Sequence, residues 1–220
     1  MIFEVPNMTT LARSLPADTR SFQTIQTHLQ QDHVIILPMA TVYSFVVNGT
    51  SPRAIAKLRR LKHFSTEQPL AILTRGDRAA EVADLSQEAK TLLAHFPYPV
   101  TMIVKGKPHL DPQITQGFDC VYLACPDRFI YDLVGALPFF LVAATVKVGT
   151  ELIVSFEDAQ KYYGEQVPLI VDGGRCAYGR RGTLVDFTLE YPTIMNFGPV
   201  SVDDLRPILP NIILPSHLMK

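Results

Sequence analysis

The amino-acid sequence predicts one α/β domain, with a mixed, twisted sheet that is flanked by helices and curves around a concave basic cleft. Three observations lead to this prediction. The chain has 220 residues, which is long for one domain and enough to bury a large core. Helical and strand patterns alternate along it without a repeat, a linker or a low-complexity stretch. Short hairpin-like connections are mixed with helical crossovers, which is typical of a sheet with both parallel and antiparallel strands.

The first half of the chain shows clear element signals. Apolar residues at helical spacing after Ser21 predict a helix over 21–29. The apolar run 33–38 ends at a proline and indicates a short buried strand. Ser51-Pro52 is a helix N-cap followed by proline at the first helical position, so we expect a helix over 51–62. The further elements expected here are a strand at 69–74, a helix at 86–95 and a strand at 100–104.

The second half continues the alternation. Residues 120–124 and 139–145 are apolar runs that predict strands, and Pro126 between them begins a helix. Ser155-Phe-Glu-Asp158 resembles a capping box with Asp in the Glu position, which predicts another helix start. Later strands are expected at 168–172, 183–187 and 193–196.

Composition excludes several classes of protein. The net charge of −1 means that any attraction to nucleic acid must come from local patches. No apolar run approaches the roughly 18–20 residues that span a bilayer, so we expect no membrane segment. Residues 1–6 lack a basic region followed by an apolar one, so we expect no signal peptide. The three cysteines are odd in number and lack Cys-x-x-Cys spacing, which favours reduced thiols and a cytoplasmic location.

The segment 171–186 combines four glycines and three arginines between two apolar runs. Glycine allows positive φ and close approach to a ligand, and arginine suits phosphate or carboxylate. Two interpretations remain open: a lip that holds an anionic ligand, or a long hairpin with a solvated tip. A phosphate-binding P-loop is rejected, because Arg180 replaces its lysine, Arg181 replaces its hydroxyl, and a strand follows instead of a helix.

The predicted helix 51–62 carries five basic residues and no acidic one between positions 53 and 62. Ile55, Leu58 and Leu61 form its apolar face at about 100° per residue. Lys62 falls on that side at the C-terminal end, where it either neutralises the helix end or reaches toward an anion. The basic run is either a solvated face or a surface for RNA phosphates.

Metal and nucleophile signals are weak. The six histidines are scattered, without His-x-x-x-His spacing, so no metal site is assigned. Asp172 and Asp186 bracket the glycine-rich segment as strand-end caps or arginine partners, with metal binding as the alternative. Cys125 and Cys176 are interpreted as buried thiols. No catalytic residue is assigned.

Five blocks of the sequence stand in a recognisable order. The first block is Pro38-Met-Ala-Thr41-Val-Tyr43-Ser44, which is similar to the motif Pro-Thr-(Asp/Glu)-Thr-x-Tyr-Gly. The second block is Lys62-His-Phe-Ser65 followed by Pro69-Leu70, which is similar to Lys-x-Arg-Pro followed by Pro-Leu. Tyr98-Pro99-Val-Thr101 is similar to Gly-Pro-x-Thr. The fourth block is Gly173-Gly174…Gly179…Gly182-Thr183-Leu-Val-Asp186, which is similar to the motif Gly-Gly…Gly…Ser-Thr-Val-Val-Asp. The fifth block is Met195-Asn-Phe-Gly198, which is similar to Leu-Arg-x-Gly. Together these blocks resemble the YrdC/Sua5/YciO family over about residues 20–200. The resemblance implies a single domain over residues 1–220, in which residues 201–220 form a C-terminal extension.

The sequence also departs from the family pattern at ligand positions. The arginine after the lysine falls on Phe64, the arginine of Arg-x-Pro on Ala124, and the late arginine on Asn196. The Ser-x-Asn-x-Ser-Gly motif becomes Ala143-Ala-Thr145-Val-Lys147-Val148, and the serine before the conserved threonine becomes Gly182. In the family these positions hold nucleotide phosphates and the threonine carboxylate, a task for which Phe or Ala cannot replace an arginine fork.

Active members of the family make threonylcarbamoyl-adenylate from threonine, bicarbonate and ATP, for the threonylcarbamoyl modification of tRNA adenosine. The resemblance therefore implies ATP with Mg as cofactor, ATP or AMP and threonine as ligands, and tRNA or double-stranded RNA as partners. The ligand-binding residues that it implies, together with nearby cations, are Thr41, Tyr43, Lys62, Thr101, Lys147, Arg180, Arg181, Thr183 and Asp186.

Three functional interpretations follow. The first is a nucleotide- or double-stranded-RNA-binding protein related to tRNA threonylcarbamoyladenosine synthesis, with weak or no synthase activity. The second is an active threonylcarbamoyl-adenylate synthase in which Arg175, Arg180, Arg181 or Lys147 replaces the missing cations. The third is a structural or partner-binding paralogue with a vestigial cleft.

Overall fold

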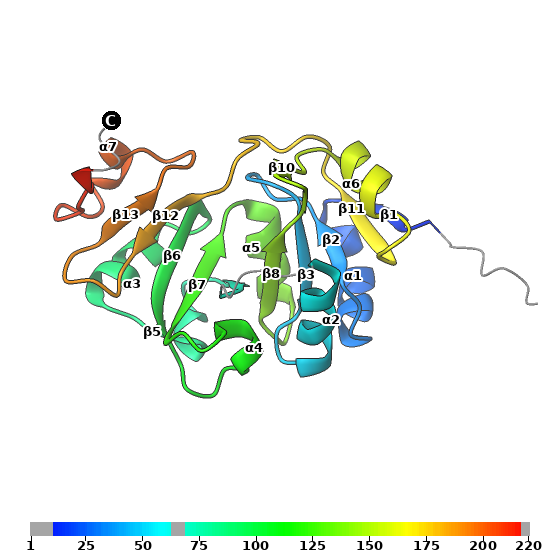
Figure 1. Ribbon diagram of the computed structural model, residues 1–220, viewed down its shortest axis with the longest axis horizontal. Helices are drawn as coiled ribbons and strands as arrows, with labels where there is room; N and C mark the ends of the chain where they lie inside the picture. The colour runs from blue at the N-terminus through cyan, green and yellow to red at the C-terminus, as the bar shows by residue number, and fades with distance from the viewer. Residues whose placement is uncertain (1–10, 63–68, 217–220) are drawn as a thin grey trace, which may run out of the picture.

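The computed structural model describes residues 11–62 and 69–216, and the side chain of Lys62 is outside this description. The described part of the chain contains an 11-stranded mixed sheet and a separate two-stranded hairpin (Figure 1). The predicted mixed α/β architecture is therefore confirmed. Phe64, one of the departures from the family pattern, lies outside the described residues.

The sheet has the order β1-β11-β2-β3-β8-β4-β7-β6-β12-β13, and β5 pairs with β6. The pairs β1/β11, β11/β2, β4/β7 and β6/β12 are parallel, and the other pairs are antiparallel. The strands of the sheet are β1 (Arg13–Pro16), β2 (Ile35–Leu37), β3 (Ser44–Asn48), β4 (Ala71–Leu73), β5 (Ala83–Asp84), β6 (Tyr98–Gly106), β7 (Cys120–Cys125), β8 (Leu141–Thr145), β11 (Leu169–Asp172), β12 (Thr183–Asp186) and β13 (Thr193–Asn196). The hairpin consists of β9 (Lys147–Val148) and β10 (Glu151–Leu152).

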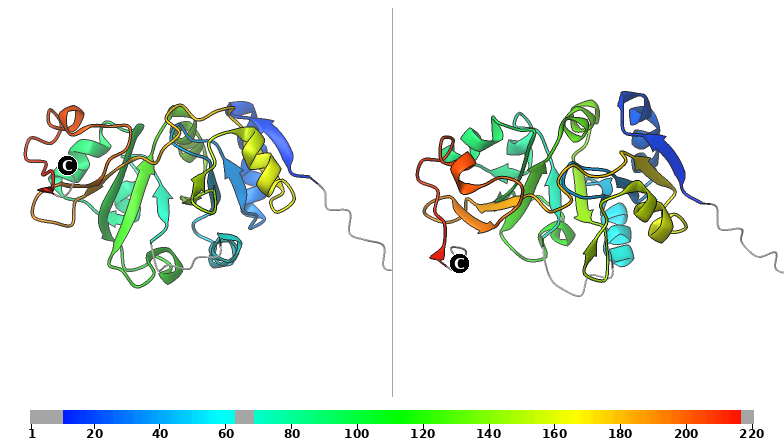
Figure 2. Two further views of the ribbon diagram at one scale, coloured as in Figure 1. Left: turned by 45° about the horizontal axis from the view of Figure 1, so that its top comes forward. Right: turned by 90° about the horizontal axis from the view of Figure 1, so that it is seen from above.

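Helices lie on both faces of the sheet, with α1 and α5 on one side and α2 and α6 on the other (Figure 2). None of the helices in the described ranges has the length and hydropathy needed to cross a membrane. The α-helices are α1 (Phe22–Gln30), α2 (Pro52–Lys62), α3 (Gln87–Leu93), α4 (Pro112–Thr115), α5 (Arg128–Ala136), α6 (Phe156–Tyr163) and α7 (Val202–Leu205), and the short 3-10 helices are η1 (Thr19–Ser21) and η2 (Ala79–Glu81).

The predicted core faces are confirmed on α2, where Ile55 and Leu58 are fully buried. Its N-cap is the expected Ser51, whose Oγ accepts a hydrogen bond from the backbone N–H of Ala54 at 3.2 Å. Sequence analysis missed β3, although Phe45, Val46 and Val47 are fully buried on it. This strand is defined by its antiparallel pairing with β2 and β8 on either side, which a local apolar pattern cannot reveal.

The glycine-rich segment is a crossover and not a hairpin, so that interpretation was wrong. β11 pairs with β1 and β2, whereas β12 pairs with β6 and β13. Six strands lie between β11 and β12 in the strand order, and residues 173–182 connect them across the top of the view in Figure 1.

The length of this connection requires a curved sheet. Seven steps between neighbouring strands span about 34 Å on a flat sheet at about 4.8 Å each. The 11 residue steps from Asp172 to Thr183 reach about 36–40 Å only when fully extended. The segment turns at Gly174 (φ 64°) and Gly179 (φ 60°) and cannot be fully extended. The sheet therefore curves toward the connection, and a hollow lies beneath it.

A histidine pair packs where α1 ends. The Nδ1 atoms of His28 and His33 are 3.0 Å apart, and their ring centroids are 5.2 Å apart. Burial lowers the pKa of both rings. The neighbouring His33 and Arg13 lower the pKa of His28 further, and Lys57 lowers that of His33, which Asp32 partly offsets. The folded protein therefore favours the neutral rings.

We predict that stability falls on acidification through this pair. Since the unfolded rings bind protons near pH 6.5 and the folded rings only at lower pH, stability is lost as the pH falls below about 6.5. Urea unfolding at pH 7.5 and 5.5 should show a smaller loss for the double variant His28→Gln/His33→Gln than for the wild type. The exposed His95→Gln variant serves as control. An unchanged pH dependence in the double variant would refute this assignment.

Candidate functional site

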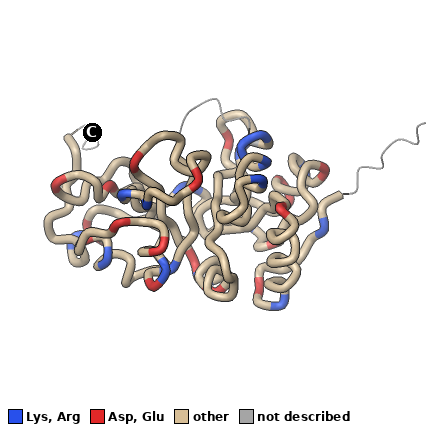
Figure 3. Tube along the Cα trace, turned by 90° about the horizontal axis from the view of Figure 1, so that it is seen from below, with Lys and Arg blue, Asp and Glu red and all other residues tan. Residues whose placement is uncertain are grey.

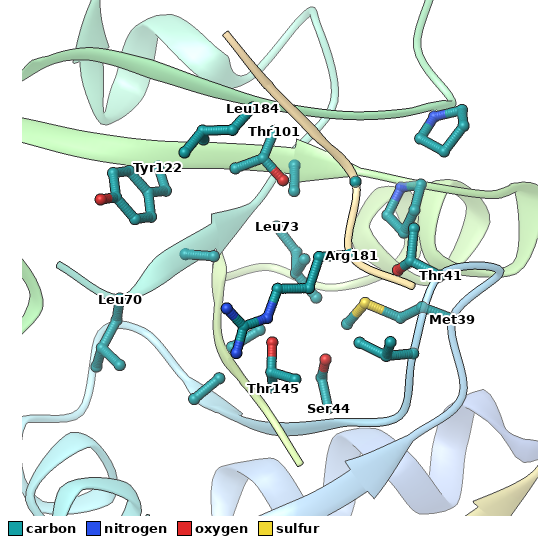
Figure 4. A pocket seen from close by; sticks show the side chains of 18 of the residues that line it. Met39, Thr41, Ser44, Leu70, Leu73, Thr101, Tyr122, Thr145, Arg181 and Leu184 are labelled. Carbon is teal, nitrogen blue, oxygen red and sulfur yellow. The ribbon is translucent and has the colours of Figure 1, made fainter. Parts of the chain in front are cut away.

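A pocket of about 290 Å³ lies beneath the glycine-rich connection, at the centre of the curved sheet. Side chains of β3, β4, β6, β7, β8 and β12 line it, together with the segment that precedes β3. Its walls are largely apolar, with Met39, Leu70, Leu73 and Leu184 among the side chains in Figure 4. An apolar pocket with a few convergent polar groups is the usual form of a small-molecule site.

Hydroxyl groups supply most of the polar lining. Thr41 precedes β3, Ser44 begins β3, Thr101 lies on β6 and Thr145 ends β8. Thr41 and Ser44 are 6% and 5% exposed. None of the four hydroxyls forms a hydrogen bond within the described part of the chain. They are therefore available to a ligand as donors or acceptors.

Arg181 is the one charged side chain among the described residues that line the pocket. It projects from the connection, and its guanidinium points into the hollow toward Thr145 and Ser44 (Figure 4). It forms neither an ion pair nor a hydrogen bond with another described residue. The expected cleft thus has a local positive charge at Arg181, whereas the rest of its described lining is apolar or neutral.

Tyr43 holds the start of the connection in place. Its hydroxyl donates to the carbonyl of Gly174 at 2.9 Å and accepts from the backbone N–H of Gly173 at 3.2 Å. Asp172 accepts from the N–H of Gly174 at 2.8 Å, which is the strand-end capping role expected for it. Gly174 has positive φ, so a side chain there would be strained. Tyr43 is fully buried and acts on the backbone of the connection rather than lining the pocket.

The backbone of Ala40 joins the pocket to two other parts of the fold. Its N–H donates to the carboxylate of Asp127 at 2.7 Å, and its carbonyl accepts from the N–H of Tyr178 at 2.8 Å. The same carboxylate caps α5 by accepting from the N–H of Ile130 at 3.0 Å. Burial raises the pKa of Asp127, and these backbone donors lower it in part. Asp127 therefore holds Thr41 in position, a role that sequence analysis missed because the contact spans 87 residues.

Thr183 and Asp186 lie away from the pocket and serve the backbone of β12. Thr183 is fully buried, and its hydroxyl donates to Val200 O at 2.7 Å and accepts from Gly198 N at 3.0 Å. A Cβ at Gly198 would lie 2.2 Å from Thr183 N, so only glycine fits there. Asp186 accepts from the N–H and the hydroxyl of Thr188 at 2.8 and 2.7 Å, the strand-end role expected for it.

The other predicted cations are not brought into the pocket. Arg180 is exposed on the connection, and Lys147 is exposed on the hairpin strand β9. On α2, Arg53 lies 3.9 Å from the Asp32 carboxylate, and Lys57 donates to the Asp32 carbonyl at 2.8 Å. Of the cations predicted to bind a ligand, the described part of the structure places Arg181 alone at the pocket, beside Thr41 and Thr101.

Five departures from the family pattern meet at this pocket. Ala124, Ala143, Thr145, Gly182 and Asn196 come from three strands and the end of the connection, and all five line it. The pocket thus brings together five positions at which the sequence resemblance implies ligand-binding residues and this chain has others. Sequence analysis had not named Ser44 as a ligand-binding residue. The signal available was a hydroxyl at the motif position where the family has glycine.

The thiols near the pocket are not activated. Cys125 is fully buried, and burial raises its pKa. Burial raises the pKa of Cys176 to about 11. Both thiols are protonated at neutral pH and are therefore poor nucleophiles. The prediction of a buried thiol is confirmed for Cys125, whereas Cys176 is only partly buried.

A pocket at the centre of a curved mixed sheet, beneath a glycine-rich crossover, is the form that a small-molecule site takes in an α/β domain. The chain belongs to the Sua5/YciO/YrdC family. The family model, which is described as Sua5_yciO_yrdC, telomere recombination, matches residues 27–198.

Curated relatives are similar over most of this chain. The threonylcarbamoyl-AMP synthase of Bacillus subtilis is 24% identical over 196 residues, which cover 82% of this chain and 54% of that protein. The threonylcarbamoyl-AMP synthase of Pyrococcus abyssi is 23% identical over 190 residues, 84% of this chain and 56% of that protein. The chain therefore spans little more than half the length of these two relatives.

Solved structures show the same fold. Sua5 of P. abyssi, complexed with L-threonine, superposes with a TM-score of 0.85 at 19% identity and covers 94% of this chain, which spans 63% of that chain. YciO of E. coli superposes with a TM-score of 0.79 at 16% identity, over 90% of this chain and 100% of that one.

We predict that Tyr43→Phe loosens the connection above the pocket. The change removes both contacts of the hydroxyl and leaves the Gly173 N–H without its acceptor, which costs about 1–3 kcal/mol of unfolding free energy. Tyr163→Phe is the matched control, because it removes one 2.6 Å hydrogen bond to the exposed hairpin residue Lys147. Urea unfolding and amide hydrogen exchange of residues 173–179 should show the larger change for Tyr43→Phe. Equal effects of the two variants would count against the role given to Tyr43.

Proposed function

We propose that this chain is a nucleotide-binding member of the YrdC/Sua5/YciO family, related to tRNA threonylcarbamoyladenosine synthesis, with weak or no synthase activity of its own. One observation carries the proposal: five of the described departures from the family pattern, Ala124, Ala143, Thr145, Gly182 and Asn196, line one pocket, whereas Lys147 and Val148 lie outside it. The changes are thus concentrated where ligands are held, while the fold around them is retained.

The chemistry of these changes supports weak turnover. Ala124 and Asn196 stand where the family pattern has arginines, and neither carries the paired donors and charge of a guanidinium. Removing one donor to a transition state typically lowers the rate by about 10²–10³. Several such losses in one pocket would nearly abolish adenylate formation, even where the ligands still bind.

The remaining lining suits a small oxygen-rich ligand. Arg181 and the hydroxyls of Thr41 and Thr101 offer donors to phosphate or carboxylate oxygens, and the apolar walls suit a base or an aliphatic group. No carboxylate is among the described lining residues, so this wall offers Mg²⁺ none of its preferred ligands. In our proposal, Mg²⁺ accompanies the nucleotide phosphates.

A second candidate function has one observation in its favour. Arg181 enters the pocket without a partner in the described chain, and it is therefore the residue best placed to replace a lost family arginine. In that case the chain is an active threonylcarbamoyl-adenylate synthase with compensating cations.

Two assays on the full chain separate these functions. We predict that ATP or AMP raises the melting temperature and that incubation with threonine, bicarbonate, ATP and Mg²⁺ releases only traces of pyrophosphate. Turnover near a typical enzyme's value of about 10 per second would establish the second candidate instead. No thermal shift with either nucleotide and no turnover would leave a structural or partner-binding protein with a vestigial cleft.

An RNA surface is a further part of this proposal. The densest run of basic residues lies on α2, the helix that leads into the grey segment in Figure 3. Arg53 and Arg60 are exposed there, as are Arg175 and Arg180 on the connection. We expect these arginines to contact phosphate oxygens, and such contacts carry no base-sequence information.

We predict that RNA binding through these residues is salt-dependent and insensitive to sequence. On B-form DNA, log affinity falls with log salt at a slope of about −0.9 per neutralised phosphate, and a steep slope is expected here too. Charge reversal of Arg175 and Arg180 should weaken binding to unrelated RNAs about equally, and Arg206→Glu, directly after α7, is the control. Filter binding at several salt concentrations measures both effects. Binding that ignores salt and the reversals would remove RNA from the proposal.

A further inference from the structure

Two hydroxyl side chains lie side by side on the floor of the pocket. Ser44 on β3 and Thr145 on β8 are direct partners in the antiparallel register of these strands. Side chains of such a pair extend from the same face of the sheet, with Cβ atoms about 4.5–5.5 Å apart. Both residues line the pocket, and Figure 4 shows their hydroxyls pointing into it.

These hydroxyls have no partner within the described chain. Ser44 is only 5% exposed and Thr145 is partly buried, yet neither hydroxyl oxygen is closed off from solvent, because both face the open space of the pocket. Thr183, a threonine of similar burial, has its hydroxyl fully used by Gly198 and Val200. The contrast indicates that Ser44 and Thr145 are directed at something that enters the pocket.

Arg181 faces this pair from the connection. Its guanidinium points toward Thr145 and Ser44, and it too lacks a partner among the described residues. A guanidinium only donates hydrogen bonds, and both hydroxyls are free to donate. Donors that converge from two sides on one space require an acceptor with several oxygens, and a guanidinium favours a charged one.

We propose that Ser44, Thr145 and Arg181 form a subsite for a single oxyanion group, the phosphate or the carboxylate of the bound ligand. The inference rests on the proposed function, because it concerns the same pocket. It goes further in naming residues that the family motifs do not contain. Position 44 is glycine and position 145 is asparagine in the motifs that this chain resembles. The subsite replaces donors that Ala124 and Asn196 no longer provide.

The test uses three variants of the full chain and three probes. The variants Ser44→Ala and Thr145→Val each remove one hydroxyl with little change of shape, and Arg181→Gln removes the guanidinium and its charge. The probes are AMP, L-threonine and adenosine, so that a phosphate, a carboxylate and an uncharged nucleoside are compared by calorimetry. Arg206→Gln, which removes a charge directly after α7 and outside the pocket lining, is the control.

We expect each of the three variants to weaken binding of the anionic probe by roughly tenfold or more, as for hydrogen bonds to charged groups. Adenosine binding should change by less than about twofold, because it offers no charged oxygen to these donors. An effect on AMP identifies the oxyanion as phosphate, and an effect on L-threonine identifies it as carboxylate. Either result supports the subsite.

Stability without ligand provides an independent readout. Since the Ser44 and Thr145 hydroxyls have no partner in the described chain, Ser44→Ala and Thr145→Val should leave the melting temperature unchanged or raise it. A clear fall would show that the hydroxyls serve the fold and would overturn the subsite. Wild-type and variant chains that bind AMP or L-threonine equally would also overturn it while leaving the proposed function intact. Failure of the wild type to bind any probe would overturn both.

Discussion

The connection between β11 and β12 is the constraint on which the rest of the structure depends. It must pass six strands with only the residues 173–182, and it turns twice on glycines with positive φ. Because the connection turns, it cannot span a flat sheet, so the sheet curves beneath it (Figure 1). The pocket and the position of Arg181 above it are therefore consequences of one short crossover.

The groups around the pocket divide into those that hold it and those that face it. The side chains of Tyr43, Asp127 and Thr183 form hydrogen bonds with backbone groups, and together they keep the connection and the segment before β3 in place. The hydroxyls of Ser44 and Thr145 have no such partner in the described chain. Polar groups that face an open pocket without a protein partner are available to a ligand, so this division separates scaffold from candidate site.

The departures from the family pattern then take on a physical meaning. Ala124 and Asn196 remove charge and donors from the pocket, while Arg181 and Ser44 bring charge and a donor to another part of its wall. The curved sheet tolerates this exchange because the backbone contacts that shape the pocket do not involve the changed side chains. A retained fold with an altered donor set is the basis for proposing ligand binding with weak turnover.

The sequence by itself determined the α/β alternation, the N-cap and core face of α2, and the family, because these depend on local spacing or on ordered motifs. It left the roles of Asp172 and Asp186 open, and the structure shows both carboxylates capping strand ends. Tertiary structure alone decided that segment 171–186 is a crossover, that β3 is a central strand, and that Arg181 rather than Arg180 or Lys147 enters the pocket. The reason is physical: strand order, register and the direction of one side chain on a loop arise from contacts between residues far apart in the chain. Ser44 and Thr145, 101 positions apart, become neighbours only because β3 pairs with β8.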